Sequence, residues 1–357
     1  MDVSSFFTRE LLDWFSENAR ELPWKKNKDP YTIWLSEIIL QQTRVEQGTP
    51  YFLKFIKAYP TVKDMALAEQ DEILSLWEGL GYYSRARNMH YTAQYIYRVH
   101  DGIFPTKYDD ILRLKGIGPY TAAAICSFAY DEARPVVDGN VIRVLSRYFG
   151  INDFVDETST KKQIQLLAEQ CIDKNHPSSY NQAIMDFGSL VCTPKNTACK
   201  QCVMSVHCLA YQFDQVQEIP KKSKKIKKRH RYFHFFVISD GKSIVLEKRA
   251  KKDIWLALYQ YPLIELEKDQ KIEESHVKKM LNPLGITSYD RVWTDDLVYK
   301  QTLTHQYIHA RFYHIHVNES IKSNSIPYYL VDFKNLRNFA FPRVVNDYPL
   351  TEEMLKK

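Results

Sequence analysis

The chain has 357 residues, of which 45% are hydrophobic, so it can bury more than one core and is not a disordered protein. Its net charge of +6 permits an anionic partner without naming one. No apolar run approaches the roughly 20 residues of a membrane-spanning helix, and the first residues lack the pattern of a secretory signal. We therefore expect a cytoplasmic protein with no membrane partner.

Apolar residues at helical spacing dominate residues 1–213. The pattern is clear in residues 7–15, 33–40, 111–114, 121–128 and 141–148, and Gly and Pro mark short turns between these segments. Several short amphipathic helices around one core predict an irregular all-α domain.

Glu37 is an acidic residue inside the apolar segment 33–40. Glu37, Gln41 and Arg44 follow one another at i, i+4 and i+7, so they would share one face of a continuous helix. Such a stripe is commonly solvated. If Glu37 instead faces a pocket with apolar walls, burial raises its pKa and keeps it protonated, as a general acid requires.

Two glycines separate the helical patterns at about 111–128, in the stretch Leu114–Thr121. Gly116 can end the first helix in a left-handed conformation, and Pro119, after Gly118, suits the first turn of the second helix. The backbone N–H groups that open this second helix could bind a phosphate. An ordinary turn between two helices also fits this pattern.

Asp138 precedes the helical segment 141–148. It can be a helix N-cap, or a second carboxylate that helix N–H groups keep ionised. Two carboxyl groups with separated pKa values are what cleavage of a glycosidic bond needs, one as an acid and one to stabilise the cationic sugar.

Four of the six cysteines lie close together, with the spacing C-x6-C-x2-C-x5-C, at Cys192, Cys199, Cys202 and Cys208. Clustered thiols in a chain of this length indicate a metal site in a reducing compartment. Structural zinc sites usually offer two C-x2-C pairs, and only one is present. A 4Fe–4S cluster is slightly favoured over zinc.

The character of the sequence changes after Phe213. Lys221–Arg231 holds eight Lys or Arg and no acid, so residues 214–231 are expected to be a basic linker. Side chains alternate from Tyr232 onward, Asp240-Gly241 marks a hairpin, and helical stretches are expected at 273–281 and near 331–339. Residues 232–357 are predicted to form an α+β domain.

These segments together resemble the adenine DNA glycosylases (MutY) of the helix-hairpin-helix iron–sulfur superfamily. Seven motifs follow the pattern of that family in order: Leu22–Trp24, Trp34–Glu37, Leu40–Thr43, Gly79–Tyr83, Gly116–Tyr120, Val137–Asn140 and the cysteine loop. The resemblance implies a multi-domain protein, with an all-α helix-hairpin-helix glycosylase domain at 1–213, an iron–sulfur loop at 192–208, and an α+β Nudix-like domain at 232–357.

The resemblance also implies catalytic roles. Glu37 would protonate adenine at N7 and then help water to attack, and Asp138 would stabilise the oxocarbenium-like sugar. Tyr120 and Asn140 would orient groups at the anomeric carbon. Relatives similar to endonuclease III carry at position 120 a lysine that forms a Schiff base and cuts the strand. Tyr120 cannot form an imine, so the resemblance implies a monofunctional glycosylase.

DNA contacts are implied in the same way. Gln42 and Tyr82 would intrude into the duplex while adenine is flipped out, and Gln41, Gly116 and Gly118 would contact the DNA.

The Nudix-like domain would read 8-oxoguanine opposite the target base. The family's lesion-reading turn is commonly Phe-Ser-His, and the corresponding run here is Tyr307-Ile308-His309. It keeps the aromatic ring and the histidine but lacks the hydroxyl.

The function expected is removal of adenine opposite 8-oxoguanine or guanine by a monomeric, nucleoid-associated bacterial-type protein with a 4Fe–4S cluster. The partner is double-stranded DNA with A:8-oxoguanine or A:G mispairs. Three rivals stay open at this point: a bifunctional endonuclease III-like glycosylase and lyase, a non-catalytic iron–sulfur DNA-binding protein, and a Nudix hydrolase fused to a DNA-binding module.

Overall fold

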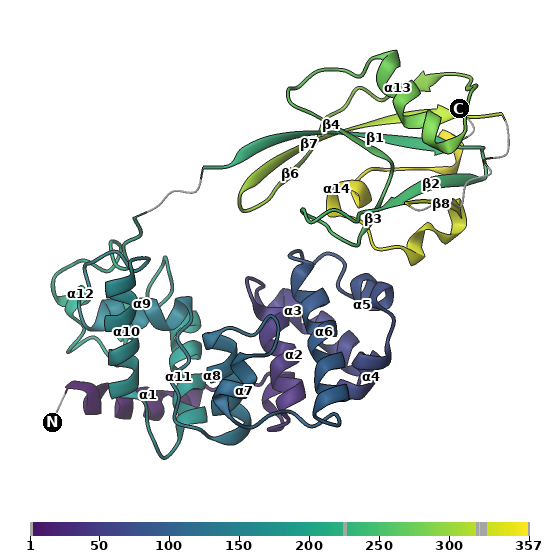
Figure 1. The fold of residues 1–357 in the computed structure, drawn as a ribbon. Coiled ribbons are helices and arrows are strands. Elements are labelled where there is room, and N and C mark those ends of the chain that lie inside the picture. The colour runs from purple at the N-terminus through teal and green to yellow at the C-terminus, as the bar shows by residue number, and fades with distance from the viewer. Residues whose placement is uncertain (1–2, 224–226, 319–320, 322–326, 356–357) are drawn as a thin grey trace. The chain divides into compact units, whose positions relative to one another are not determined.

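The computed structural model describes residues 3–223, 227–318, 321 and 327–355 (Figure 1). The chain divides into two compact units. One unit comprises Met1–Leu67 and Asn88–Lys225, and the other Ala68–Arg87 and Ile226–Lys357. The boundaries expected above differ from this division, because they place residues 68–87 in the helical domain.

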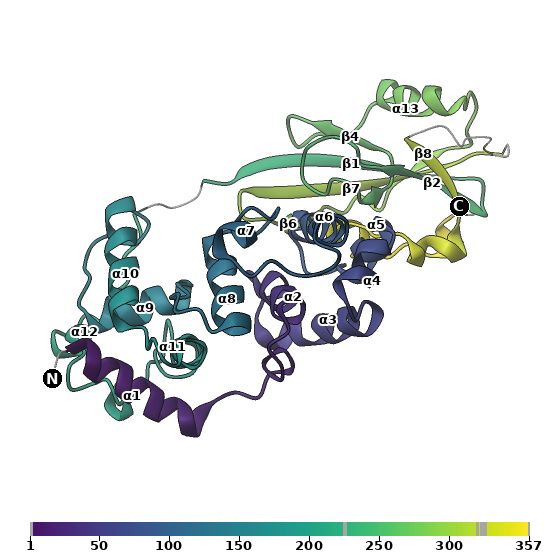
Figure 2. The same ribbon diagram turned by 60° about the horizontal axis from the view of Figure 1, so that its bottom comes forward.

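The first unit is built from helices, as residues 1–213 predict. Their bounds are α1 Val3–Asn18, α2 Pro30–Leu40, α3 Val45–Ala58, α4 Val62–Leu67, α6 Ser84–Val99 (in this unit from Asn88), α7 Tyr108–Leu112, α8 Pro119–Tyr130, α9 Gly139–Tyr148, α10 Thr158–Cys171, α11 Pro177–Leu190 and α12 Leu209–Gln212. Helices α2, α3, α7 and α8 form one lobe, and α1, α9, α10, α11 and α12 form another (Figures 1 and 2). The contact of α8 with α11 joins the two lobes.

Helix α2 shows how the sequence buries an acid. Asp29 caps the helix by accepting hydrogen bonds from the N–H groups of Tyr31 and Thr32, and Pro30 occupies its first turn. Every residue from Tyr31 to Ile39 is buried, so the helix has no solvated face. The helix ends at Leu40, and the expectation that Glu37, Gln41 and Arg44 share one helical face is therefore wrong.

The second unit holds a mixed eight-stranded sheet. The elements are α5 Gln70–Leu76, β1 Arg229–Ser239, β2 Ser243–Lys248, β3 Tyr259–Gln260, β4 Leu263–Leu266, α13 Glu274–Leu281, β5 Val292–Trp293, β6 Tyr299–Thr302, β7 Gln306–His316, β8 Tyr328–Asp332 and α14 Arg343–Asn346. Strands run in the order β3-β2-β1-β7-β5, while β4 pairs with β1, β6 with β7 and β8 with β2. Only β1 and β7 pair in parallel among the described strands.

The core of this sheet lies under α13, where Val277, Met280 and Leu281 pack against Phe236 and Ile315. The hairpin at Asp240-Gly241 and the helix at 273–281 are present as predicted. The helical stretch expected near 331–339 is present as a 3-10 helix, Phe333–Asn338, which begins directly after strand β8 ends at Asp332.

The linker expected at 214–231 differs from the structure at both ends. Val216 and Ile219 are buried against Ala210, so the first unit continues past Phe213. Residues 224–226 of the basic run lie outside the described residues, and Arg229–Arg231 already belong to β1.

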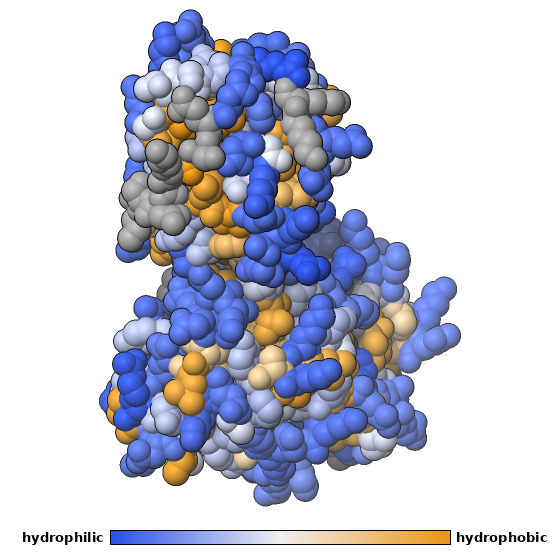
Figure 3. Space-filling model, turned by 90° about the vertical axis from the view of Figure 1, so that its right-hand side faces the viewer, coloured by the Kyte–Doolittle hydropathy of each residue, from blue (hydrophilic) through white to orange (hydrophobic). Residues whose placement is uncertain are grey.

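The molecular face in Figure 3 is largely hydrophilic, and its apolar side chains form scattered groups rather than a continuous band. Among the helices that the structure describes, none has the length and apolar character needed to cross a bilayer.

Candidate functional site

Glu37 is a buried acid on α2, with only 7% of the residue exposed. Burial raises the pKa of Glu37 from 4.5 to about 7, the hydrogen bond with Tyr120 opposes this rise, and the charge of Asp138 adds to it. Tyr120 is the second residue of α8, and burial raises its own pKa, so its hydroxyl is a neutral donor to the Glu37 carboxylate. A large fraction of Glu37 therefore carries a proton near neutral pH, as a general acid needs.

Asp138 is the N-cap of α9. Its carboxylate accepts hydrogen bonds from the backbone N–H groups of Asn140 and Val141, both 2.8 Å long, and from the Asn140 side-chain amide at 2.7 Å. Burial raises the pKa of Asp138, and these hydrogen bonds together with Arg143 oppose the rise. Three donors face Asp138 and one faces Glu37, so a proton shared by the pair resides on Glu37.

Arg143 holds Asn140 in place and was missed from the sequence. Its Nη2 donates to Asn140 Oδ1 at 2.9 Å and to the Gly188 carbonyl at 2.6 Å. Its Nε donates to the Cys192 carbonyl at 2.7 Å. The only sequence signal was a cation three residues after Asn140, on the same side of a helix.

An open cavity of about 770 Å³ lies beside α8 and the start of α9. Tyr120 and Val137 are part of its wall, together with Tyr108, Arg134 and Ile142. Its size is within the range of about 300–1,000 Å³ for small-molecule sites. Three separate helices, α2, α8 and α9, thus bring Glu37, Tyr120 and Asp138 together, and of these three residues Tyr120 lines the cavity.

The hairpin between α7 and α8 has the geometry that its glycines predict. Gly116 adopts φ +84°, and a Cβ added to it would meet the side chain of Asn88. Gly118 is the N-cap of α8, with φ −101°. Because glycine has no side chain, it supplies no capping acceptor to the first N–H groups of α8. This geometry agrees with the phosphate site expected from the sequence, which stays a prediction.

Alanine substitutions at Gly116 and Gly118 are expected to have different effects on stability. We expect Gly116→Ala to lower the free energy of unfolding by about 1–2 kcal/mol, because its φ disfavours a Cβ, and the new Cβ would lie 2.8 Å from Asn88 Cβ. We expect the hairpin distortion to weaken duplex binding as well. Gly118→Ala is the matched control for stability, because a Cβ there meets open space. Thermal unfolding checks this, and equal losses of stability in the two variants would contradict it. A duplex titration of Gly116→Ala checks the expected loss of binding.

Two of the expected DNA contacts share an unusual backbone. Gln42, in the first unit, and Tyr82, in the second, are exposed and have φ of 57° and 46°. Residues with side chains rarely adopt this left-handed region, and such strain is concentrated at functional sites. Gln41 points elsewhere, since its Nε2 donates to Thr121 Oγ1 on α8 at 3.2 Å.

The expected lesion-reading turn is instead part of strand β7. Ile308 is fully buried, whereas Tyr307 and His309 are on the opposite face. On that face four rings follow one another in the order Tyr307, His230, His309 and Tyr232, with neighbouring centroids about 5 Å apart. His309 stacks on His230 and on Tyr232, whereas the rings of Tyr307 and His230 are tilted. His230 Nδ1 and His309 Nε2 are 2.9 Å apart. The alternation of side chains in β1 carried the signal for His230 and Tyr232, which were not among the predicted site residues.

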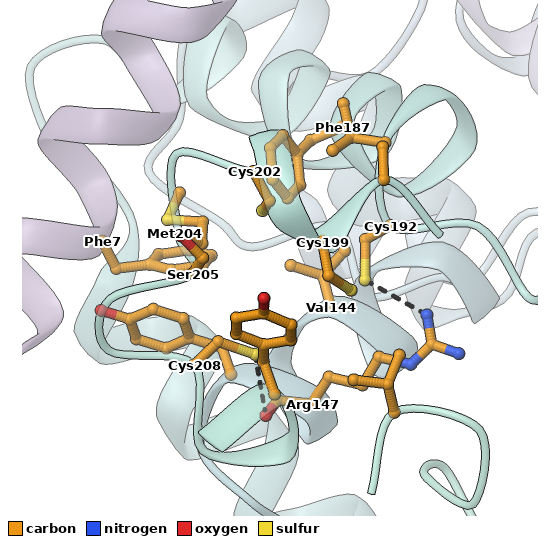
Figure 4. Close-up of a pocket in the computed structure, with 15 residues that line it drawn as sticks. Phe7, Val144, Arg147, Phe187, Cys192, Cys199, Cys202, Met204, Ser205 and Cys208 are labelled. Carbon is orange, nitrogen blue, oxygen red and sulfur yellow. Dashed lines mark hydrogen bonds between the residues drawn. The ribbon is translucent and has the colours of Figure 1, made fainter. Parts of the chain in front are cut away.

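The four clustered cysteines line one cavity of the helical unit, with their side chains around it (Figure 4). Arg147 Nη1 donates to Cys192 Sγ at 3.4 Å. A single zinc ion needs its thiolates within about 2.3 Å of one point. Among the described residues no three His, Cys, Asp or Glu are grouped so closely.

Known proteins match both units. Residues 35–172 match the HhH-GPD superfamily of base excision DNA repair proteins, and residues 233–348 match the NUDIX domain. The adenine DNA glycosylase of Buchnera aphidicola subsp. Schizaphis graminum (strain Sg) is 40% identical over 257 residues, which cover 72% of this chain and 74% of that protein. This chain belongs to the adenine DNA glycosylase family. It is a DNA glycosylase of base excision repair.

More distant relatives agree with this assignment. The adenine DNA glycosylase of Homo sapiens is 38% identical over 215 residues, covering 58% of this glycosylase and 39% of that protein. A solved thermostable thymine-DNA glycosylase superposes with a TM-score of 0.55 at 28% identity, covering 59% of this chain and 97% of the other. An endonuclease III structure with DNA, at 20% identity and a TM-score of 0.51, covers 58% of this chain and 95% of the other and shares the fold.

Proposed function

We propose that this glycosylase removes adenine from A:8-oxoguanine and A:G mispairs by hydrolysing the N-glycosidic bond. The observation that carries the proposal is the meeting of Glu37 and Asp138 at one site, with one carboxyl group protonated and the other held by N–H donors. The anomeric carbon is inaccessible inside the base stack, so the adenosine must first leave the helix and enter the cavity beside Tyr120.

Each side chain then has a defined task. Glu37 protonates N7 of adenine, which makes the base a better leaving group, and the resulting carboxylate activates the attacking water. Asp138 stabilises the positive charge that develops on the sugar. Asn140 keeps Asp138 oriented, and the neutral Tyr120 hydroxyl orients Glu37. Tyr120 offers no amine, so the product is an abasic site rather than a nicked strand.

Duplex DNA would be held by several groups of the chain. The free N–H groups at the start of α8, with Gly116 and Gly118, suit a phosphate. The exposed Gln42 and Tyr82 suit insertion between base steps, and Gln41 would support Gln42 from its hydrogen bond with Thr121.

We infer that the cysteine cavity holds a 4Fe–4S cluster, which the spacing of the four cysteines favours slightly over a single zinc ion. Four thiols from one loop surround a space with apolar walls that include Val144 and Met204, and Arg147 offers positive charge next to Cys192. Bound there, the cluster would cross-link the loop to the core of its lobe. Cys192, Cys199, Cys202 and Cys208 would each supply one thiolate.

Recognition of the opposite base is assigned to Tyr307 and His309. Their rings stand on a half-exposed face of β1 and β7 and are extended by His230 and Tyr232. A row of aromatic faces suits a flat purine. Monomeric action and a cytoplasmic, nucleoid-associated location stay predictions.

One assay tests the proposal. Duplexes with adenine opposite 8-oxoguanine, guanine or thymine are incubated with the protein, and strand breaks are read after alkali. We expect breaks for the first two only, none without alkali, and no adduct trapped by borohydride. Breaks without alkali would favour the bifunctional alternative, and intact DNA after alkali would contradict adenine removal.

A further inference from the structure

The segment that leads into Asp138 has no regular secondary structure of its own. From Asp131 to Val137 the backbone is neither helix nor strand. Glu132 N–H donates to the Cys126 carbonyl at 3.0 Å, and Arg134 N–H to the Glu132 carbonyl at 2.7 Å. Pro135 has no N–H to donate. The approach to Asp138 must therefore be held from outside the segment.

Asn181 on α11 fixes this segment through side-chain hydrogen bonds. It is 1% exposed, and its Oδ1 accepts the N–H of Val136 at 3.0 Å. Its Nδ2 donates to the Arg134 carbonyl and to Ser127 Oγ, both at 2.8 Å. The Asn181 amide thus hydrogen-bonds to the residues on both sides of Pro135 and to Ser127 on α8, the helix that carries Tyr120.

The same face of α11 also touches the other side of Asp138. Gly188 lies two helical turns after Asn181, so the two residues share a face. A Cβ on Gly188 would lie 2.7 Å from Asn140 Cβ and 3.2 Å from the Asn140 carbonyl oxygen. Arg143, which holds Asn140, donates to the Gly188 carbonyl. Helix α11 therefore contacts the chain two residues before and two residues after Asp138.

We propose that Asn181 is a positioning residue for base excision, which acts by setting the place of the Asp138 carboxylate against Tyr120 and Glu37. The inference rests on the role proposed for Asp138. Three hydrogen bonds from a buried amide to two elements restrict movement along the whole approach. A displacement of about 1 Å at a reacting group can cost on the order of 100-fold in rate.

The test begins with Asn181→Ala and single-turnover excision from a duplex with adenine opposite 8-oxoguanine. We expect the rate to fall at least about 10-fold, because a misplaced Asp138 stabilises the cationic sugar less well. We expect the dissociation constant for the duplex to stay within about threefold, since Asn181 is 1% exposed and so has almost no surface to contact a duplex. Thr8→Ala is the control, because it removes a side-chain bond to the Cys171 carbonyl in the same unit, and it should leave the rate unchanged.

A double substitution distinguishes a role of Asn181 through Asp138 from a merely structural role. If Asn181 acts through Asp138, adding Asn181→Ala to Asp138→Asn lowers the residual rate by less than about twofold, because the shared interaction is already lost. If Asn181→Ala lowers the excision rate as much in the Asp138→Asn background as it does alone, the inference is overturned. A wild-type rate for Asn181→Ala alone would also overturn it. If Asp138→Asn itself excises normally, the proposed role of Asp138 fails instead. Should Asn181→Ala not fold, Gly188→Ala, which presses on Asn140 from the same face, must show the same pattern.

Discussion

We expect Glu37→Gln to lower single-turnover excision of adenine by about 10²–10⁴-fold, the usual contribution of a general acid. The amide has the same shape but no proton to give to adenine. Tyr120 can still donate to its oxygen, so the site should keep its geometry. Binding of the mispaired duplex should persist within about threefold, because the substitution removes an interaction made in the transition state. Single-turnover kinetics and a binding titration check both halves.

The control for Glu37→Gln is Glu46→Gln, which makes the same chemical change at an exposed position in the first turn of α3. It should excise like the unchanged protein. An active Glu37→Gln variant would refute the assignment of the acid. A variant that loses binding together with excision would place Glu37 in DNA contact and not in the chemistry.

The second large effect is expected from Cys202→Ala. Cys202 and Cys208 pack against the core of the α1 and α9–α12 lobe, so losing a ligand of the proposed cluster would release both a cross-link and apolar packing. We expect the melting temperature to fall by about 10 °C or more, as a loss of about 3 kcal/mol or more gives in a domain of this size. Bound iron, visible absorbance and excision should be lost together.

Cys171→Ala is the matched control for the cysteine loop. Cys171 is equally part of that core, with 1% exposed, but lies outside the loop. It should keep its iron and most of its excision rate. Full iron content in Cys202→Ala would contradict the ligand set, and zinc in place of iron in the unchanged protein would restore the zinc alternative.

Local patterns in the sequence were reliable where local physics decides the outcome. The hairpin needed a left-handed residue, and Gly116 provides it. The residue before a helical run of apolar side chains was a cap, and Asp138 caps α9. Alternation in β1 and β7 predicted paired strands, and the register brings their aromatic rings together.

Local patterns failed where distant segments decide. Neither glycine nor proline follows Leu40 directly, so nothing in the pattern marked the end of α2 before Gln41. The approach of Arg143 to Gly188 and that of Asn181 to Val136 each join positions 45 residues apart, which no periodicity records. The Tyr307–His309 run was expected as a turn through family resemblance, whereas pairing with β1 and β6 extends it.

The central claim is that a protonated Glu37 releases adenine next to an ionised Asp138, and the dependence of the single-turnover rate on pH tests it most directly. The folded-state pKa of Glu37 is raised to about 7, so the acid form is present below that pH and is lost above it. The account predicts a rate that falls by about tenfold for each pH unit above about 7, for an acid that acts only when protonated. A rate that stays level or rises from pH 6 to 9 would contradict it.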